Sequence, residues 1–189
     1  MIDHWFDFIC PYCYVGQGRT AILRRRGLAV EELSLQIHPE IGPGGVPAPA
    51  RIGPGYDALA AEAERGRLPL AWGERIAYSR PALVLSELVR LRHHDRHPDF
   101  VARVFDAYFG RGLDIERSDV LAACLEEAEI QGVGSSEEEL AEGERGLLRS
   151  AAEARAAGVT GTPAWRIDGE LIVGLQPARV FESLRIAGG

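Results

Sequence analysis

The sequence contains no lysine, so all of its 21 basic side chains other than histidine are arginines. This absence excludes enzyme mechanisms in which a lysine amine forms a Schiff base with the substrate. Acidic residues number 28, which gives a formal net charge of −7. Nucleic-acid-binding domains normally present a basic face, and the acidic balance therefore predicts no nucleic-acid partner.

Long apolar runs are also absent. No segment approaches the roughly 20 consecutive apolar residues that span a bilayer, so we expect no membrane partner. The start of the chain, "MIDHWFDF", lacks the basic and then apolar layout of a signal peptide, which favours a cytoplasmic location. With 189 residues, 46% of them hydrophobic, the chain can bury the core of one domain with an insertion. A monomer and a homodimer are both compatible with this composition.

Cysteine is scarce too, because only Cys10, Cys13 and Cys124 are present. Three cysteines are too few for a disulfide scaffold. A structural zinc site needs four ligands, and only Cys124 and histidines remain to complete one. Cys124 lies on an apolar helical face, where a buried and inert thiol is expected, and the histidine-rich segment 93–97 is interpreted as a solvated helix end. We therefore predict no metal site.

The first secondary-structure signals form a β-α-β unit. Alternating apolar and polar residues predict strands at 2–8 and 33–38. Between them, Pro11 can open a helix that continues to Arg26 and ends at Gly27. A β-α-β unit implies that its two strands are parallel.

The middle of the chain has mainly helical signals. Residues 39–55 are dense in proline and glycine, which predicts a long loop without regular structure. From 56 to 158 almost every signal is helical. Ser118 is an expected N-cap, and Ser136 with Glu139 matches a capping box before a long helix.

Strand signals return near the C-terminus. We expect strands at 163–167 and 171–173, joined by a hairpin turn at Asp168–Gly169. Pro177 can then open a last helix. The order of elements is therefore β-α-β, a helical block, and β-β-α.

The segment Cys10–Pro11–Tyr12–Cys13 follows the first strand at a helix start. A disulfide between its cysteines closes too small a loop to remove much entropy from the unfolded chain, so it suits chemistry better than stabilisation. Free backbone N–H groups and the helix dipole favour a thiolate at Cys10. Cys13 lies one turn along, where it can displace a mixed disulfide. This context is typical of thioredoxin-like thiol–disulfide exchange.

A second motif, Thr162–Pro163, stands at the start of a late strand. Proline is confined to strand starts and edges because it cannot donate to the ladder. A cis peptide bond here would turn the loop toward Cys10, and the backbone of Thr162 could then pair with an extended substrate segment. An ordinary trans proline in a turn is the alternative.

Three further residues are candidates for tuning the cysteines. Asp7 lies three residues before Cys10; a buried carboxyl with a raised pKa could assist proton transfer at Cys13. The alternative is a solvated aspartate at a strand end. Pro11 and Tyr12, between the cysteines, are expected to tune the stability of the thiolate.

The segments "FDFICPYCY" and "GVTGTPAWRIDGELIVGLQP" resemble the DsbA family of thioredoxin-fold oxidoreductases. They are most similar to its cytoplasmic FrnE-like branch, which is related to 2-hydroxychromene-2-carboxylate isomerases and kappa-class glutathione transferases. The resemblance spans essentially the whole chain. It implies an α/β thioredoxin fold with a large all-helical insertion. Residues 1–45 would form the first half of this fold, 46–150 the loop and helical insertion, and 151–189 the second half.

The resemblance also implies roles for the motif residues. Cys10 would be the nucleophile, Cys13 its resolving partner, and Thr162–Pro163 a cis-proline loop beside them. The isomerase and transferase relatives generally carry serine at the first position and use glutathione, whereas both positions are cysteine here, which favours dithiol–disulfide exchange. We expect no cofactor beyond the redox-active cysteine pair. Protein or small-molecule thiols and disulfides are the expected partners, with glutathione as a candidate co-substrate.

Two other functions stay open at this point. One is a glutathione-dependent isomerase or transferase that acts on small aromatic compounds, whose turnover would survive loss of Cys13. The other is a redox-inactive peptide-binding or chaperone module, whose peptide binding would not depend on either cysteine.

Overall fold

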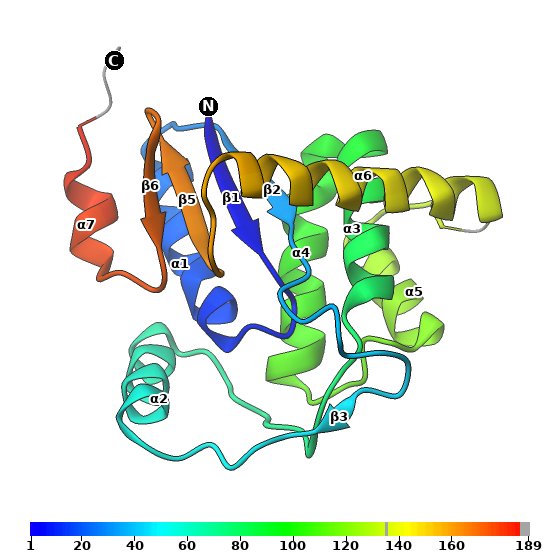
Figure 1. Ribbon diagram of the computed structural model, residues 1–189, viewed down its shortest axis with the longest axis horizontal. Helices are drawn as coiled ribbons and strands as arrows, with labels where there is room; N and C mark the ends of the chain where they lie inside the picture. Colours follow the sequence, from blue (N-terminus) through cyan, green and yellow to red (C-terminus); the bar gives the residue numbers. More distant parts are fainter. Residues whose placement is uncertain (135, 186–189) are drawn as a thin grey trace.

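The protein is built on a four-stranded mixed sheet with helices packed around it (Figure 1). This computed structural model describes residues 1–134 and 136–185. The strands of the sheet are β1 (Ile2–Phe6), β2 (Val30–Ser34), β5 (Ala164–Ile167) and β6 (Glu170–Val173). Their spatial order is β2-β1-β5-β6, in which β1 and β2 are parallel and β5 is antiparallel to both of its neighbours.

The helices follow the order expected from the sequence. They are α1 (Pro11–Arg25), α2 (Pro54–Gly66), α3 (Arg80–Arg92), α4 (His97–Phe105), α5 (Ser118–Glu127), α6 (Glu137–Ala156) and α7 (Ala178–Ser183). A 3₁₀ turn (His94–Arg96) precedes α4, and a π-helical turn (Asp106–Gly110) follows it. Within the described residues, no helix has the length and apolar character needed to cross a membrane.

Strand β1 is buried on both faces because helices cover both. On one face, Ile2 packs with Leu23 of α1 and Phe181 of α7. On the other face, Trp5 packs with Ala154 of α6. The first part of the chain (β1-α1-β2) and the last part (β5-β6-α7) thus share one sheet, and the helices between them form an insertion (Figure 1). The predicted α/β class and the parallel first strand pair are confirmed.

The insertion packs against the end of the sheet, and its own helices pack closely on one another. At the end of β1, Phe8 meets Phe105 of α4 edge-on, with ring centroids 5.0 Å apart. Farther along, α6 packs closely on α3, since a Cβ at Gly143 would lie 2.4 Å from the carbonyl oxygen of Val84. The segment that leads to Cys10 is therefore packed against the insertion at Phe8.

Two strand predictions were wrong in their bounds. β1 ends at Phe6 instead of residue 8, and β2 spans Val30–Ser34 instead of 33–38. The alternation beyond Ser34 belongs to a segment that leaves the ladder: Leu35 N still donates to Phe6 O, but Ile37 N donates to the Asp7 carboxylate. The apolar alternation of residues 33–38 thus continues beyond Ser34, although β1, the partner of β2, already ends at Phe6.

The prediction of an irregular segment at 39–55 was partly wrong. Val46–Pro47 forms a short strand, β3, which pairs with β4 (Arg75–Ile76) in a second sheet. The side chain of Arg75 stabilises this pair by donating to the carbonyls of Gly44 and Gly45. β4 also interrupts the region expected to be almost wholly helical.

Most predicted helix and turn boundaries are confirmed. Ser136 and Glu139 form the expected capping box. In the hairpin turn, Asp168 and Gly169 both have positive φ, at 51° and 86°. Ser118 was wrong as an N-cap, because the cap position is Arg117 and Ser118 is the first helical residue.

Candidate active site

Cys10 lies at the junction between β1 and α1. A turn after β1 is closed by a hydrogen bond from Cys10 N to Asp7 O, and the extended backbone of Cys10 makes it the N-cap residue. Pro11 follows at the first helical position, and no acidic residue stands in the first turn. No side chain caps this helix end, so its free N–H groups and the positive end of its dipole are available to the Cys10 sulfur.

The two sulfurs of the motif are electronically unequal. All three cysteines are free thiols; Cys10 is 4% exposed and Cys13 is fully buried. Burial disfavours the Cys10 thiolate, but hydrogen bonds from Cys13 and Thr162 outweigh it and lower the pKa of Cys10. Burial and the adjacent Cys10 raise the pKa of Cys13 well above its ordinary value. The arrangement therefore favours one thiolate, at Cys10, beside a protonated Cys13.

The Thr162–Pro163 motif lies directly against Cys10, although 152 positions separate them in the chain. The peptide bond between Thr162 and Pro163 is cis. The Cys10 thiol donates to the carbonyl oxygen of Thr162 over 3.3 Å. Farther along α1, a Cβ at Gly16 would lie 3.4 Å from the Pro163 ring, so the helix packs closely on this loop. The fold thus brings together the two motifs on which the sequence analysis depended.

Asp7 is buried beside the cysteine pair. Its Oδ1 accepts a hydrogen bond from Ile9 N over 3.3 Å, and its Oδ2 accepts one from Ile37 N over 2.9 Å. Burial raises the pKa of Asp7 to about 6, because it outweighs these two amide donors. The charge of Asp7 in turn acts to raise the pKa of Cys10. The alternative of a solvated strand-end aspartate is therefore wrong.

Tyr12 belongs to the first turn of α1, and its side chain approaches the insertion. It is half-buried, and a Cβ at Gly55 would come within 3.2 Å of its hydroxyl oxygen, so the start of α2 is close to the cysteine motif. The neighbouring Tyr14 is buried and donates to Pro69 O. These contacts fix the insertion against the first turn of α1.

Cavity size alone does not locate this site. A groove of about 640 Å³ lies between α3, α5 and α6, with Val84, Leu121 and Leu140 among its apolar lining. None of its lining residues belongs to either motif. A much smaller cleft, of about 60 Å³, is lined by Ile9 and Pro11, which flank Cys10.

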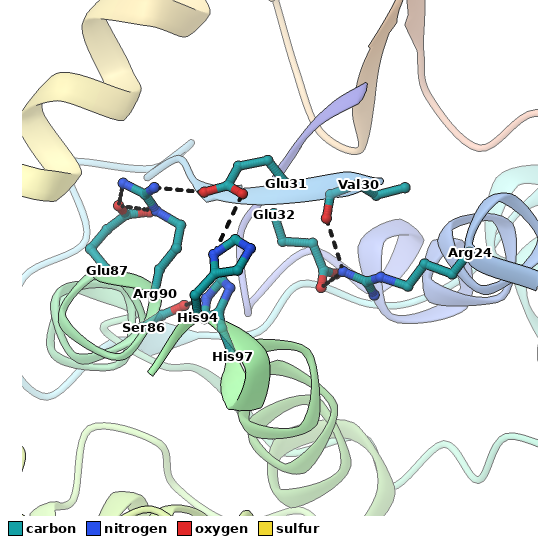
Figure 2. A network of polar contacts seen from close by, with 9 residues as sticks. All are labelled: Arg24, Val30, Glu31, Glu32, Ser86, Glu87, Arg90, His94 and His97. Carbon is teal, nitrogen blue, oxygen red and sulfur yellow. Dashed lines mark hydrogen bonds and ion pairs between the residues drawn. The ribbon is translucent and has the colours of Figure 1, made fainter. Parts of the chain in front are cut away.

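Sequence reasoning missed a polar network around β2 (Figure 2). Glu32 of β2 is almost fully buried and accepts a 2.7 Å hydrogen bond from Arg24 of α1. Burial alone would raise the pKa of Glu32, but His4 and Arg24 outweigh it and lower this pKa to about 2. Nearby, Arg90 of α3 pairs with Glu31 over 2.7 Å.

The interpretation of segment 93–97 as a solvated helix end was wrong for His97. This residue is buried, and its Nε2 lies 2.9 Å from Ser86 Oγ within the polar network (Figure 2). Burial lowers the pKa of His97 to about 3. In the described residues, no group of three or more His, Cys, Asp or Glu side chains is arranged to hold a metal ion. The strand sequence "VEELS", in which Glu32 is buried and Glu31 partly so, was the available signal for this network.

Comparison with known proteins supports the fold. A search of curated proteins finds no match. A probable DsbA oxidoreductase of Streptomyces coelicolor is 23% identical, with a TM-score of 0.76 over 96% of this chain and 86% of that chain. The cytosolic disulfide reductase DsbM of Pseudomonas aeruginosa is 17% identical, with a TM-score of 0.65 over 96% and 92%. A 2-hydroxychromene-2-carboxylate isomerase is 18% identical, with a TM-score of 0.67 over 96% and 92%.

These identities are low, so the structural similarities establish the fold alone. The family is established by sequence: the model of the DSBA-like thioredoxin domain matches residues 1–184. The predicted thioredoxin fold is thereby confirmed, with the helical insertion between its halves. The chain belongs to the DSBA-like thioredoxin domain family.

Proposed function

We propose that this protein is a thiol–disulfide oxidoreductase that uses Cys10 as its nucleophile and Cys13 as its resolving thiol. The observation that carries the proposal is the contrast between the two sulfurs, since the pKa of Cys10 is lowered and that of Cys13 is raised. A thiolate is the attacking species in exchange, and a resolving thiol must wait until a mixed disulfide has formed.

The proposed reaction of the reduced enzyme has two steps. The Cys10 thiolate attacks one sulfur of a substrate disulfide, and the other substrate sulfur leaves with the bonding electrons and takes up a proton. Cys13 then loses its proton and attacks the Cys10 sulfur, which releases the second substrate thiol. Two electrons pass from the enzyme dithiol to the substrate, and the oxidised enzyme reacts with thiols by the reverse steps.

Asp7 is proposed to accept the Cys13 proton in the second step. Its pKa of about 6 leaves it largely ionised near neutral pH, in a buried place beside both cysteines. Two backbone amides, the Ser79 hydroxyl and the charge of His38 favour its ionised form, but burial outweighs them, and no arginine in the described residues pairs with it. It can therefore take up and return a proton at little electrostatic cost.

The Thr162–Pro163 loop is proposed to hold the reacting sulfur and the substrate backbone. The Thr162 carbonyl already accepts a hydrogen bond from the Cys10 thiol. The Thr162 side chain also favours the Cys10 thiolate, since a hydrogen bond from it acts to lower the pKa of Cys10. An extended substrate can pair with the backbone of Thr162, which is partly exposed, and Pro11 and Tyr12 tune the thiolate through their place in the helix start.

The relatives support small and protein thiols as partners. DsbM of Pseudomonas aeruginosa is described as a cytosolic disulfide reductase and has been solved with glutathione, whereas another relative is a periplasmic thioredoxin-like protein. We propose a cytoplasmic thiol–disulfide exchange with glutathione or a similar thiol as co-substrate. The similarity to an isomerase favours glutathione-dependent isomerisation as the second candidate.

The test follows the thiols of the reduced protein as it reacts with glutathione disulfide. We expect Cys10→Ser to reduce exchange to the uncatalysed background. Cys13→Ser should accumulate a mixed disulfide, visible by mass spectrometry as one glutathione adduct per chain. The matched control is Cys124→Ala, which should exchange at the wild-type rate. Full exchange by Cys10→Ser would refute the assignment; turnover of an aromatic substrate that persists in Cys13→Ser would favour the isomerase.

A further inference from the structure

A narrow cleft lies directly beside the nucleophile. Ile9 and Pro11, the two neighbours of Cys10, line it together with Arg51 and Trp72 from the insertion. The cleft has a volume of about 60 Å³. Because one water molecule occupies about 30 Å³ in the liquid, the cleft has room for one small group and not for a folded segment of protein.

Arg51 gives this cleft an uncompensated positive charge. Its guanidinium carbon lies 4.8 Å from the ring centroid of Trp72, and one of its nitrogens donates to Gly73 O over 2.5 Å. No carboxylate in the described part of the chain forms an ion pair with it. By contrast, the buried Arg19 and the network residue Arg24 each pair with a glutamate.

Tyr108 lines the same cleft and senses the charges around it. Burial raises the pKa of the Tyr108 phenol, while a hydrogen bond with the Ala77 backbone and the positive charge of Arg51 act to lower it. Asp7 and Asp114 act in the opposite direction and rank below Arg51 among these causes. The charge of Arg51 therefore reaches Tyr108 across the cleft, where it would favour an anionic group of a bound molecule.

A guanidinium held over an aromatic ring is well suited to bind a carboxylate. Its remaining N–H groups can donate two parallel hydrogen bonds to the two oxygens. Contact with Trp72 restrains the Arg51 side chain, which therefore loses less conformational entropy when it binds a carboxylate. The group that these features select is small, planar and negatively charged.

We propose that this cleft binds the carboxylate of a small anionic thiol or disulfide, and that Arg51 selects such substrates. The proposal rests on the thiol–disulfide exchange proposed above for Cys10. With the carboxylate on Arg51, the Cys10 thiolate bonds to the nearer substrate sulfur, and the farther sulfur leaves with the electron pair and takes up a proton. The 4% exposure of Cys10 agrees with a substrate of this size.

The overall charge of the protein makes the proposal testable. A net charge of −7 and a thiolate at the reacting atom both repel anions, so the global field predicts that cationic disulfides react fastest. A preference for anionic disulfides would require a local positive group. The rate order of disulfides that differ only in charge therefore separates the two cases.

The experiment uses three small disulfides with the reduced full-length protein. They are dithiodipropionate, which carries two carboxylates, the neutral bis(hydroxyethyl) disulfide, and cystamine, which carries two ammonium groups. The rate of loss of the two active-site thiols is measured by alkylation and mass spectrometry at low ionic strength. We expect the wild-type protein to react about tenfold faster with the anionic than with the neutral disulfide, as for one charge-assisted contact.

The variants assign the preference to Arg51. Arg51→Gln should lose the tenfold preference through a higher KM for the anionic disulfide, and should keep its rate with the neutral one, which also shows that it is folded. Arg51→Lys should retain part of the preference. The matched control is Arg25→Gln, which removes the same charge from an exposed position at the far end of α1 and should behave as wild type.

The possible failures are distinguishable. Equal rates with all three disulfides, or an anionic preference that persists in Arg51→Gln, would overturn the role of Arg51 while leaving the exchange reaction intact. If the wild-type protein reacted with none of the disulfides, including the neutral one, the proposed exchange at Cys10 would itself fail.

Discussion

Two buried carboxyl groups near β1 behave in opposite ways. Opposite the middle of β1, Glu32 of the adjacent strand has its pKa lowered to about 2. Where β1 ends, Asp7 has its pKa raised to about 6. Both side chains are at most 3% exposed, so the extent of burial does not explain the difference.

The difference comes from the charges that surround each group. Glu32 has a guanidinium at 2.7 Å, from Arg24, and the ring of His4 at 3.6 Å. Asp7 accepts hydrogen bonds from the backbone amides of Ile9 and Ile37, and Ser79 and the charge of His38 also act to lower its pKa, but no arginine in the described residues pairs with it. A buried carboxylate beside a cation stays ionised, whereas one without a cation is free to titrate near neutral pH. The first arrangement suits a structural link, and the second suits proton transfer beside a thiol.

The largest effect on stability is expected from Glu32→Gln, which removes the buried partner of the ion pair with Arg24. Removing one partner of a buried ion pair costs about 3–5 kcal/mol. Arg24 is 33% exposed and can be solvated in part, so we expect a loss near the lower end, about 3 kcal/mol, in urea unfolding at neutral pH. The rate of thiol exchange should not change.

Acid unfolding sharpens the same prediction. Because the folded-state pKa of Glu32 is lowered from 4.5 to about 2, its contribution to stability is complete above about pH 4.5 and is lost as the pH falls toward 2. Glu32→Gln should remove this part of the acid dependence. The control is Glu142→Gln, which breaks a pair with Arg92 in which both side chains are about one-third exposed and should cost about 0.5 kcal/mol or less. Equal losses in the two variants would contradict the comparison.

A smaller effect of opposite sign is expected from Asp7→Asn. The folded-state pKa of Asp7 is raised from 3.8 to about 6, so its contribution to stability is complete below about pH 3.8 and is lost as the pH rises through 6. The ionised form thus destabilises the protein by roughly 3 kcal/mol at neutral pH. Asparagine avoids this cost but offers an acceptor to only one of the two amides, and we expect a net gain of about 1–2 kcal/mol.

The same variant tests the proposed proton transfer. Without a carboxylate beside Cys13, the mixed disulfide should persist longer, and the pH dependence of its resolution near pH 6 should disappear. Urea unfolding between about pH 4 and 8 and quench-flow trapping of the mixed disulfide measure the two effects. A stability curve that still falls between about pH 4 and 6, or an unchanged rate of resolution, would contradict the role given to Asp7.

The parts of the site that are local in sequence could be predicted. The helix start at Cys10 follows from Pro11 and a preceding strand, and the spacing of the cysteines follows from one helical turn. The strand start at Thr162–Pro163 is also a local signal. The topology of the sheet then places these segments together, which is why the resemblance of two short motifs was enough to identify the fold.

The parts of the site that depend on residues distant in the sequence could not be predicted. Asp7 is buried, and one of its hydrogen-bond donors is the backbone N–H of Ile37, 30 positions later in the chain. His97 is buried beside Ser86 rather than solvated, which no pattern within its own helix indicates. Nothing in the sequence distinguishes Arg51 from other loop residues, but the fold places it in the lining of the same cleft as Pro11. In each case the environment is made by a segment that sequence spacing does not relate to the residue.

The smallest effect is expected from Cys124→Ala, which compares the third thiol with the first. Cys124 is fully buried in α5, and burial raises its pKa to about 11. Cys10 is almost as buried but has its pKa lowered, because hydrogen bonds at a helix start offset the burial. If this difference decides reactivity, iodoacetamide should label only Cys10 in the reduced native protein at neutral pH. Cys124→Ala should then leave the labelling and exchange rates unchanged and cost about 1 kcal/mol of stability through a small cavity; labelling of Cys124 at a rate comparable to Cys10 would show that burial does not protect it.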